Sequence, residues 1–129
     1  MFISRHTLKW TKTCRSSGDF PHAHTAHFLL NRHMDTQDTL DYCAKVGLAF
    51  VCWSPLGGYR HPYDETKFDP FREVAAAHGV SYQQVVLAWE LAKGDHMFVI
   101  PGAHHPETIL DSLKADQLEL TPEELAKLG

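Results

Sequence analysis

The sequence lacks the features that mark membrane, secreted and nucleic-acid-binding chains. Its 129 residues hold no apolar run close to the roughly 20 residues that a membrane-spanning helix needs. The start, MFISRHTLKW, lacks the long apolar core of a secretion signal. A net charge of −4 offers no basic field for nucleic acid or an anionic membrane surface. We therefore expect neither a membrane nor a nucleic acid among its partners.

Cysteine is also scarce. The three cysteines, Cys14, Cys43 and Cys52, are an odd number, and no CxxC spacing occurs. Two of them, Cys43 and Cys52, fall on faces predicted to be buried. This usage predicts reduced thiols and a cytoplasmic chain.

Two short apolar stretches predict buried strands. Leu48–Trp53 is apolar without alternation, as a strand covered on both faces of a parallel sheet requires, and Ser54 then ends it. Met97–Ile100 is a second such stretch, and Pro101 stops it. In α/β folds, ligands bind beyond the carboxyl ends of the strands. The two loops that follow these stretches are therefore candidate binding segments.

Helix start signals surround these strands. The predicted starts are Asp35 or Thr36, the cap Asp69 with Pro70, the capping box Ser81–Gln84, Pro106, and Thr121 with Glu124. Helices alternating with strands predict an α/β fold with parallel strands. The residues predicted to face the core are Leu40, Cys43 and Val46; Phe71, Val74 and Ala75; Val85, Ala88, Trp89 and Ala92; Ile109, Leu110 and Leu113; and Leu125 and Leu128.

The first 26 residues have no sustained period of 2 or 3.6 residues. We expect an irregular or disordered leader over residues 1–26 and a second segment over residues 27–129, with His27–Leu30 as the possible end of a strand. His22 and His24 have a spacing that could bind a transition metal, but only Asp19 lies near them as a further ligand. A solvated leader explains these histidines more simply, so no metal site is assigned.

The two strand ends suggest a nucleotide. An aromatic at the end of a strand, here Trp53, can stack on a flat heterocycle. The loop from Pro101 leads into a helix start at Pro106, where backbone N–H groups and the helix dipole attract phosphate. A core role for Trp53 and a plain tight turn at Gly102–Ala103 are the alternative interpretations.

Four motifs resemble one protein family. WSPLGG, HGVSYQQVVLAWELA, FVIPGAHHPETILDSL and LELTPEEL are similar to the C-terminal part of aldo-keto reductases. The resemblance covers roughly residues 29–129, behind an unmatched N-terminal leader. It implies a partial (β/α)8 TIM barrel that carries only the C-terminal strands and helices. It also implies an NAD(P)H-dependent oxidoreductase that reduces a small carbonyl substrate by hydride transfer.

The resemblance assigns roles to cofactor-binding residues. It implies that Trp53 stacks on the nicotinamide and that a segment around Gly57 wraps the pyrophosphate. It further implies that the loop after the second strand holds the 2′-phosphate and that the following helix flanks the adenine. The full set of implied cofactor residues is Trp53, Ser54, Leu56, Gly57, Ile100, Gly102, Ala103, His104, His105, Thr108, Asp111 and Ser112.

The sequence departs from the family at the 2′-phosphate. Many relatives place Lys and then Ser or Thr where this chain has Gly102 and Ala103, and Arg near His105 and Thr108. Without a fixed cation, we expect only a weak preference between NADP and NAD. His104 and His105 would add partial charge near or below neutral pH. Ser112 replaces a common Asn.

The catalytic residues of the family are missing. Its Asp, Tyr, Lys and His come from strands upstream of the matched region, so no catalytic residue is assigned. We expect the chain to carry part of a cofactor site and to be inactive alone. The alternatives are a non-catalytic remnant and a nucleotide- or metal-binding interaction module. Uncovered strand edges also predict self-association.

Overall fold

A computed structural model describes residues 23–26, 37–53, 55–56 and 65–129 of the chain. The predicted helix cap at Asp35 or Thr36 and the strand end at His27–Leu30 lie outside these residues. So do His22 and His27. In the part of the chain that is described, no helix is long and apolar enough to cross a bilayer.

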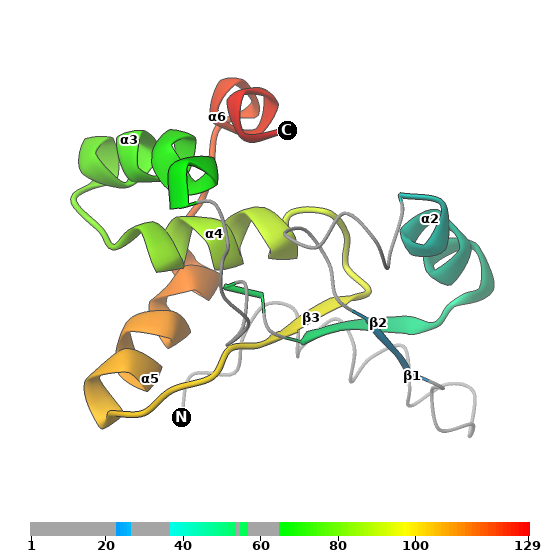
Figure 1. The fold of residues 1–129 in the computed structure, drawn as a ribbon. Coiled ribbons are helices and arrows are strands. Elements are labelled where there is room, and N and C mark those ends of the chain that lie inside the picture. The colour runs from blue at the N-terminus through cyan, green and yellow to red at the C-terminus, as the bar shows by residue number, and fades with distance from the viewer. Residues whose placement is uncertain (1–22, 27–36, 54, 57–64) are drawn as a thin grey trace.

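The centre of the fold is a three-stranded parallel sheet, shown in Figure 1. Its strands are β1 (Ala23–Ala26), β2 (Ala49–Trp53) and β3 (Met97–Ile100), in the order β1-β2-β3. Both pairings are parallel, which confirms the predicted sheet type. The strand predicted at Met97–Ile100 is confirmed, and the other begins one residue later than predicted.

Strand β1 was not predicted. It lies within the leader, and the expectation of irregular structure is wrong for these four residues. The sequence AHTA has no apolar run and no large β-branched or aromatic residue except Thr25, so local propensity gives little signal. The strand forms because β2 supplies a partner along its whole length, from Ala23 beside Ala49 to Ala26 beside Cys52.

The helices follow the predicted order. They are α2 (Gln37–Val46), α3 (Asp69–His78), α4 (Tyr82–Leu91), α5 (Pro106–Leu113) and α6 (Pro122–Leu128), with short 3-10 turns at Glu65–Phe68 (η1) and Lys114–Gln117 (η2). Gly47 and Gly79 have left-handed φ angles of 74° and 65° after α2 and α3, as glycine allows. Asp69 is not the cap of α3, because Phe68 takes that position. The Asp69 carboxylate instead accepts a hydrogen bond of 2.7 Å from Arg72.

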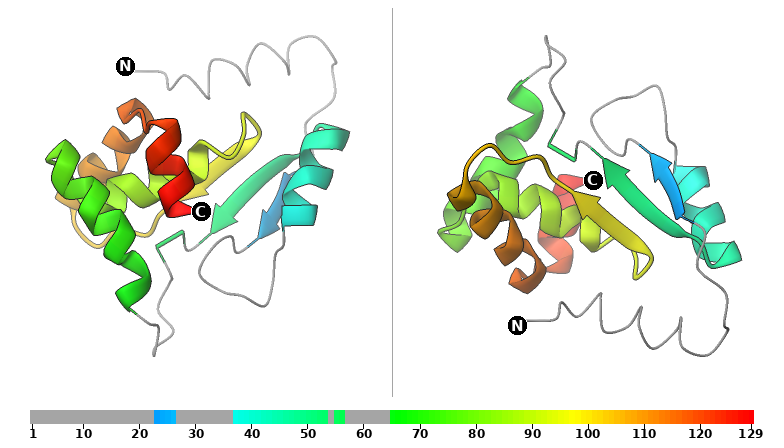
Figure 2. Two further views of the ribbon diagram at one scale, coloured as in Figure 1. Left: turned by 90° about the horizontal axis from the view of Figure 1, so that it is seen from above. Right: turned by 90° about the horizontal axis from the view of Figure 1, so that it is seen from below.

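The core lies between the helices and one face of the sheet. Helices α3, α4 and α6 are stacked beyond β3, whereas α2 lies beside β1 and β2 (Figures 1 and 2). Phe50 and Met97, which are adjacent in the sheet, are both 0% exposed. The other buried members of this cluster are Leu40, Cys43, Cys52, Phe68, Phe71, Val74, Ala75, Val85, Val86 and Trp89.

Some residues predicted to face the core are exposed. In α2, Leu40 and Cys43 are buried as predicted, but Val46 is 47% exposed. In α5, the residues Ile109, Leu110 and Leu113 are 52%, 61% and 64% exposed. Their spacing on one side of a helix is that of a buried stripe. No described element covers this stripe, so the pattern identified an apolar face correctly but not its burial.

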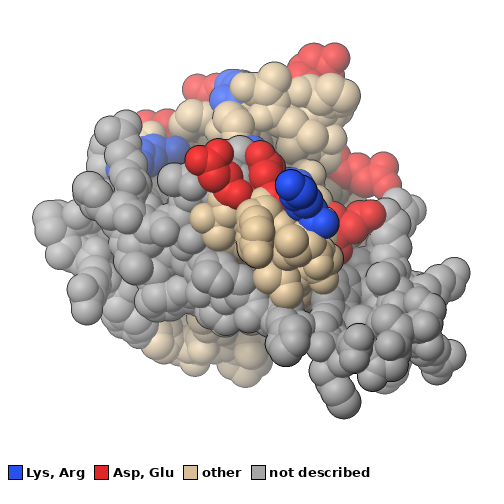
Figure 3. Space-filling model, turned by 90° about the vertical axis from the view of Figure 1, so that its right-hand side faces the viewer, with Lys and Arg blue, Asp and Glu red and all other residues tan. Residues whose placement is uncertain are grey.

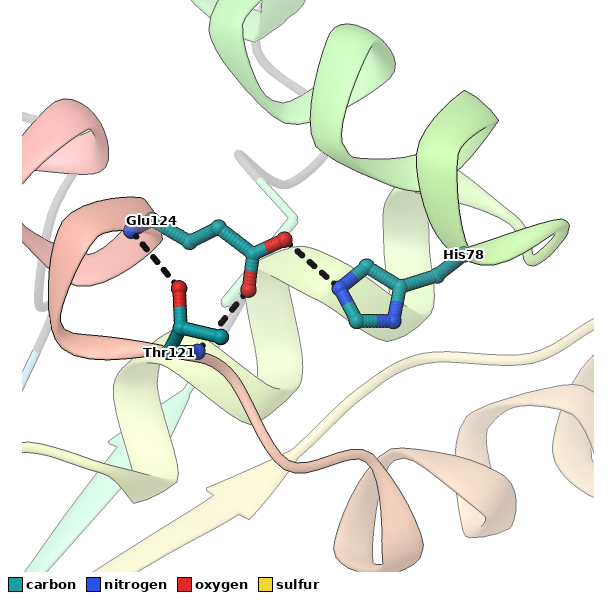
Figure 4. A network of polar contacts seen from close by, with 3 residues as sticks. All are labelled: His78, Thr121 and Glu124. Carbon is teal, nitrogen blue, oxygen red and sulfur yellow. Dashed lines mark hydrogen bonds and ion pairs between the residues drawn. The ribbon is translucent and has the colours of Figure 1, made fainter.

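Helix α6 is fixed to α3 by a polar network, drawn in Figure 4. Thr121 accepts a hydrogen bond from the Glu124 backbone, and the Glu124 carboxylate accepts one from the Thr121 backbone at 2.8 Å. This confirms the predicted helix start. The other Glu124 oxygen lies 2.7 Å from Nε2 of His78. These contacts lower the pKa of Glu124, and the hydrogen bond from the Thr121 N–H has the largest effect.

The face of the molecule around α2 carries charges of both signs. Figure 3 shows acidic and basic side chains close together among the residues it describes there. Helix α2 contributes Asp38 to its first turn and Lys45 to its last turn. A negative charge in the first turn and a positive charge in the last turn both interact favourably with the helix dipole.

Candidate functional site

The sheet brings the two candidate strand ends together. Trp53 is the register partner of Ile100, so the loops after β2 and β3 leave the sheet side by side, about 4.8 Å apart at the last pair. The side chain of Trp53, together with Ser54 and Gly57, lies outside the described residues. Leu56 is half-buried and packs against the core.

The loop after β3 is open to solvent. Gly102, Ala103, His104 and His105 are all exposed, and Ile100 is 52% exposed. A Cβ built on Gly102 meets no atom within 4 Å. The backbone therefore has room on its outer side for a ligand.

This loop runs into the first turn of α5. His105 takes the cap position with an extended backbone and forms no side-chain cap. The Thr108 N–H donates to the His105 carbonyl at 3.1 Å. Pro106 has no N–H, so the Glu107 amide is the first helical donor at this end. The helix dipole adds partial positive charge beside the exposed loop.

Asp111 is held by residues at the start of α4. Its Oδ2 accepts a hydrogen bond of 2.5 Å from the Ser81 hydroxyl, and its Oδ1 accepts one of 2.5 Å from the Gln84 side-chain amide. Ser81 also caps α4 by accepting from the Gln84 N–H at 3.2 Å. The predicted capping box is therefore only half formed, because the Gln84 side chain is directed to Asp111. The carboxylate joins α5 to α4.

Ser112, the next residue, is half-buried. It lines a cavity between α4, β3 and α5, and Pro101 and Ala103 of the loop line the same cavity. The structure thus brings together the strand ends, the loop 101–105 and Thr108. Asp111 is bound to α4 instead, whereas Ser112 shares its cavity with Pro101 and Ala103 of the loop.

Glu90 is a buried acid that the sequence reasoning missed. It lies in α4, is 0% exposed, and neither carboxyl oxygen has a hydrogen-bond partner of ordinary geometry among the described residues. Burial raises its pKa to about 9, and the nearby Cys52 thiol, a weak donor, acts in the opposite direction. The acid is therefore protonated at neutral pH. In the sequence, the burial of Glu90 is indicated only by its position within the apolar run around Trp89.

Comparison with known proteins decides the family. A model of the aldo/keto reductase family matches residues 4–129. The chain belongs to the aldo-keto reductase family. Pyridoxine 4-dehydrogenase of Escherichia coli is 32% identical over 96 residues, which are 74% of this chain and 32% of that protein. The chain therefore spans about a third of the length of this curated relative.

Solved aldo-keto reductases have the same fold. The thermostable aldo-keto reductase Tm1743, in complex with the inhibitor epalrestat, matches 98% of this chain and 44% of its own, with 27% identity and a TM-score of 0.70. A mutant of Gox0644 in complex with NADPH matches 98% of this chain and 43% of its own, with 20% identity and a TM-score of 0.67. The chain thus forms part of a (β/α)8 barrel, as predicted.

The family match corrects the extent of the resemblance. The leader was expected to be unmatched, but the match begins at residue 4. Part of this newly matched segment is strand β1, which pairs in parallel with β2. The first 26 residues have no periodic hydrophobic pattern, so the sequence analysis did not recognise the strand.

Proposed function

We propose that this chain supplies the cofactor side of an NAD(P)H-dependent carbonyl reductase. The nucleotide lies across the carboxyl ends of β2 and β3. The nicotinamide is next to Trp53, and the phosphates are along the loop 101–105 and the first turn of α5. The bound cofactor supplies the hydride for carbonyl reduction.

The register pairing of Trp53 with Ile100 carries this proposal. It places the starts of the two candidate loops, which follow β2 and β3, side by side. The exposed backbone around Gly102 and the N-terminal end of α5 then fit an anionic group. The family membership supports the same cofactor class, and NADPH is bound in the Gox0644 structure.

The fit is incomplete at the adenosine end. Residues 101–113 contain no Lys or Arg, and both oxygens of Asp111 accept hydrogen bonds from α4. The site therefore holds phosphate mainly through backbone donors and discriminates weakly between NADPH and NADH. In this proposal, Asp111 positions α5 and does not act mainly as an adenine ligand.

Reduction of a carbonyl needs a general acid and the remaining barrel strands. We propose that the isolated chain binds nucleotide without turnover, and that the rest of an aldo-keto reductase barrel provides the acid and the substrate pocket. Non-catalytic nucleotide binding is the alternative function that the open site also fits.

An equilibrium titration tests the proposal. NADPH and then NADH are added to the purified chain while tryptophan fluorescence is recorded. We expect saturable quenching by both nucleotides, with dissociation constants within about fivefold of each other. Trp53→Phe should remove most of the quenching. Absence of saturable binding by a folded chain would overturn the proposal.

A further inference from the structure

Glu90 has no charged neighbour acting on it in the part of the chain that the structure describes. Its side chain is 0% exposed in α4, and the influences on its pKa are burial, which is the larger, and the Cys52 thiol. The described residues of α3, β3, α5 and η2, which pack against α4, add no charged or titratable group to these two. An ionised carboxylate without a partner costs far more than the neutral acid at such a site. The side chain is therefore held uncharged.

Cys52 connects Glu90 to the sheet. It lies in β2 and is also 0% exposed. Its backbone is paired on both sides, beside Ala26 in β1 and beside Val99 in β3. A thiol is a weak hydrogen-bond donor, so the contact with the acid is mainly one of close packing. Because packed interiors leave little free space, a displacement of the Glu90 side chain is transmitted to the central strand of this sheet.

The contact lies directly before the proposed nicotinamide position. Trp53 follows Cys52 and is the last residue of β2. With Ile100 it forms the last pair of the register between β2 and β3. Support of the strand at Cys52 therefore acts on the backbone from which both candidate loops leave the sheet.

The geometry points to Glu90 as a positioning residue for the cofactor: from α4, its uncharged side chain supports, through Cys52, the end of β2 that carries Trp53. Loss of its proton would place a charge without a partner in an apolar site, and hydration of that charge requires α4 to separate locally from the sheet. The strand ends then lose their support and bind nucleotide less tightly. The inference rests on the proposed function, because it concerns the nicotinamide end of that site.

NMR of the nucleotide-free chain tests the structural step. The carbonyl-carbon signals of Trp53 and Ile100 are recorded from pH 7.5 to pH 9.5, where circular dichroism confirms that the chain is folded. We expect both signals to follow one titration curve. Glu90→Gln, which has a similar size and no charge at any pH, should abolish this curve. Signals that do not move, or that move equally in Glu90→Gln, would overturn the inference.

Glu123→Gln is the matched control. It makes the same chemical change at an exposed position in α6, away from the strand ends. The signals of Trp53 and Ile100 should titrate in this variant as in the original chain. Loss of the titration in the control as well would also overturn the inference, because the effect would then not belong to Glu90.

NADPH titrations over the same pH range test the coupling to the cofactor. The 2′-phosphate completes its ionisation near pH ~6, so a change between pH 7.5 and pH 9.5 belongs to the protein. The dissociation constant should rise about threefold or more in the original chain and in Glu123→Gln, and stay constant in Glu90→Gln. At pH 7.5, Glu90→Gln should bind like the original chain, because the amide replaces the neutral acid.

The two measurements separate this inference from the proposed function. Absence of NADPH binding at pH 7.5, with carbon signals that titrate through Glu90, would refute the proposed function alone. NADPH binding of equal strength at both pH values by the folded original chain would refute the positioning role alone.

Discussion

If the loop 101–105 holds the 2′-phosphate as proposed, Gly102 is the residue at which the cofactor preference can be changed most simply. Its φ angle is not in the left-handed region, and an added Cβ meets no neighbour within 4 Å. A longer side chain therefore fits without backbone strain. The resemblance to the family also places a Lys at this position in many relatives.

Gly102→Lys should favour NADPH. A charge-assisted hydrogen bond to the 2′-phosphate contributes roughly 1.5–3 kcal/mol, so the ratio of the NADH to the NADPH dissociation constant should rise about tenfold or more. Gly102→Met is the control, since it has similar length and no charge. An equal gain for NADH, or the same gain with Met, would contradict a phosphate at this loop.

Glu90 makes the stability of the chain depend on pH. Its pKa is about 9 in the folded chain, above its ordinary value of 4.5. The folded chain therefore holds one more proton than the unfolded chain between these values. The stability that protonation provides is complete below pH 4.5 and is lost as pH rises toward 9.

The free energy of unfolding should thus fall from pH 5 to pH 9, by at most about 1.4 kcal/mol per pH unit from this group. Glu90→Gln should flatten this dependence in denaturant unfolding experiments. Glu107→Gln, at an exposed position in α5, serves as the control and should leave the slope as in the original chain. If the original chain and Glu90→Gln show the same slope, Glu90 is not the source of the pH dependence of stability.

At the scale of elements, the contact between α4 and α5 depends on Asp111. Asp111→Ala removes the acceptor for both the Ser81 hydroxyl and the Gln84 amide. We expect a loss of about 1–3 kcal/mol in the free energy of unfolding, because two polar groups lose their partner. Glu107→Ala, in the same helix and exposed, should change it by less than about 0.5 kcal/mol. Calorimetric melting of both variants measures the difference.

Local signals predicted the elements well where caps and apolar runs coincide. The Thr121 start of α6 and the strand Met97–Ile100 are confirmed for this reason. Strand β1 could not be predicted, because AHTA pairs through its backbone with a distant segment. For the apolar stripe of α5, the sequence predicted the face correctly but not whether it is buried. Its periodicity predicts an apolar face, but burial depends on an element that the described chain does not provide.

At the scale of the whole molecule, the family was visible from four motifs, whereas the arrangement within the site was not. The alternation of helices and strands predicted parallel strands, and the parallel register of Trp53 with Ile100 confirms this. The separate orientations of Asp111 and Ser112 could not be predicted. That of Asp111 depends on Ser81 and Gln84, about 30 residues away in sequence, and Ser112 lines a cavity formed by several distant segments.

The location of the bound nucleotide is the most direct test of the whole account. Two-dimensional NMR of the isotopically labelled chain, recorded with increasing NADPH, reports each backbone amide separately. We predict that the largest shift changes fall on residues 100–108 and at the end of β2, and that α3 and α6 are unaffected. Shift changes confined to α3 and α6, or none at saturating NADPH, would contradict a nucleotide site at these strand ends.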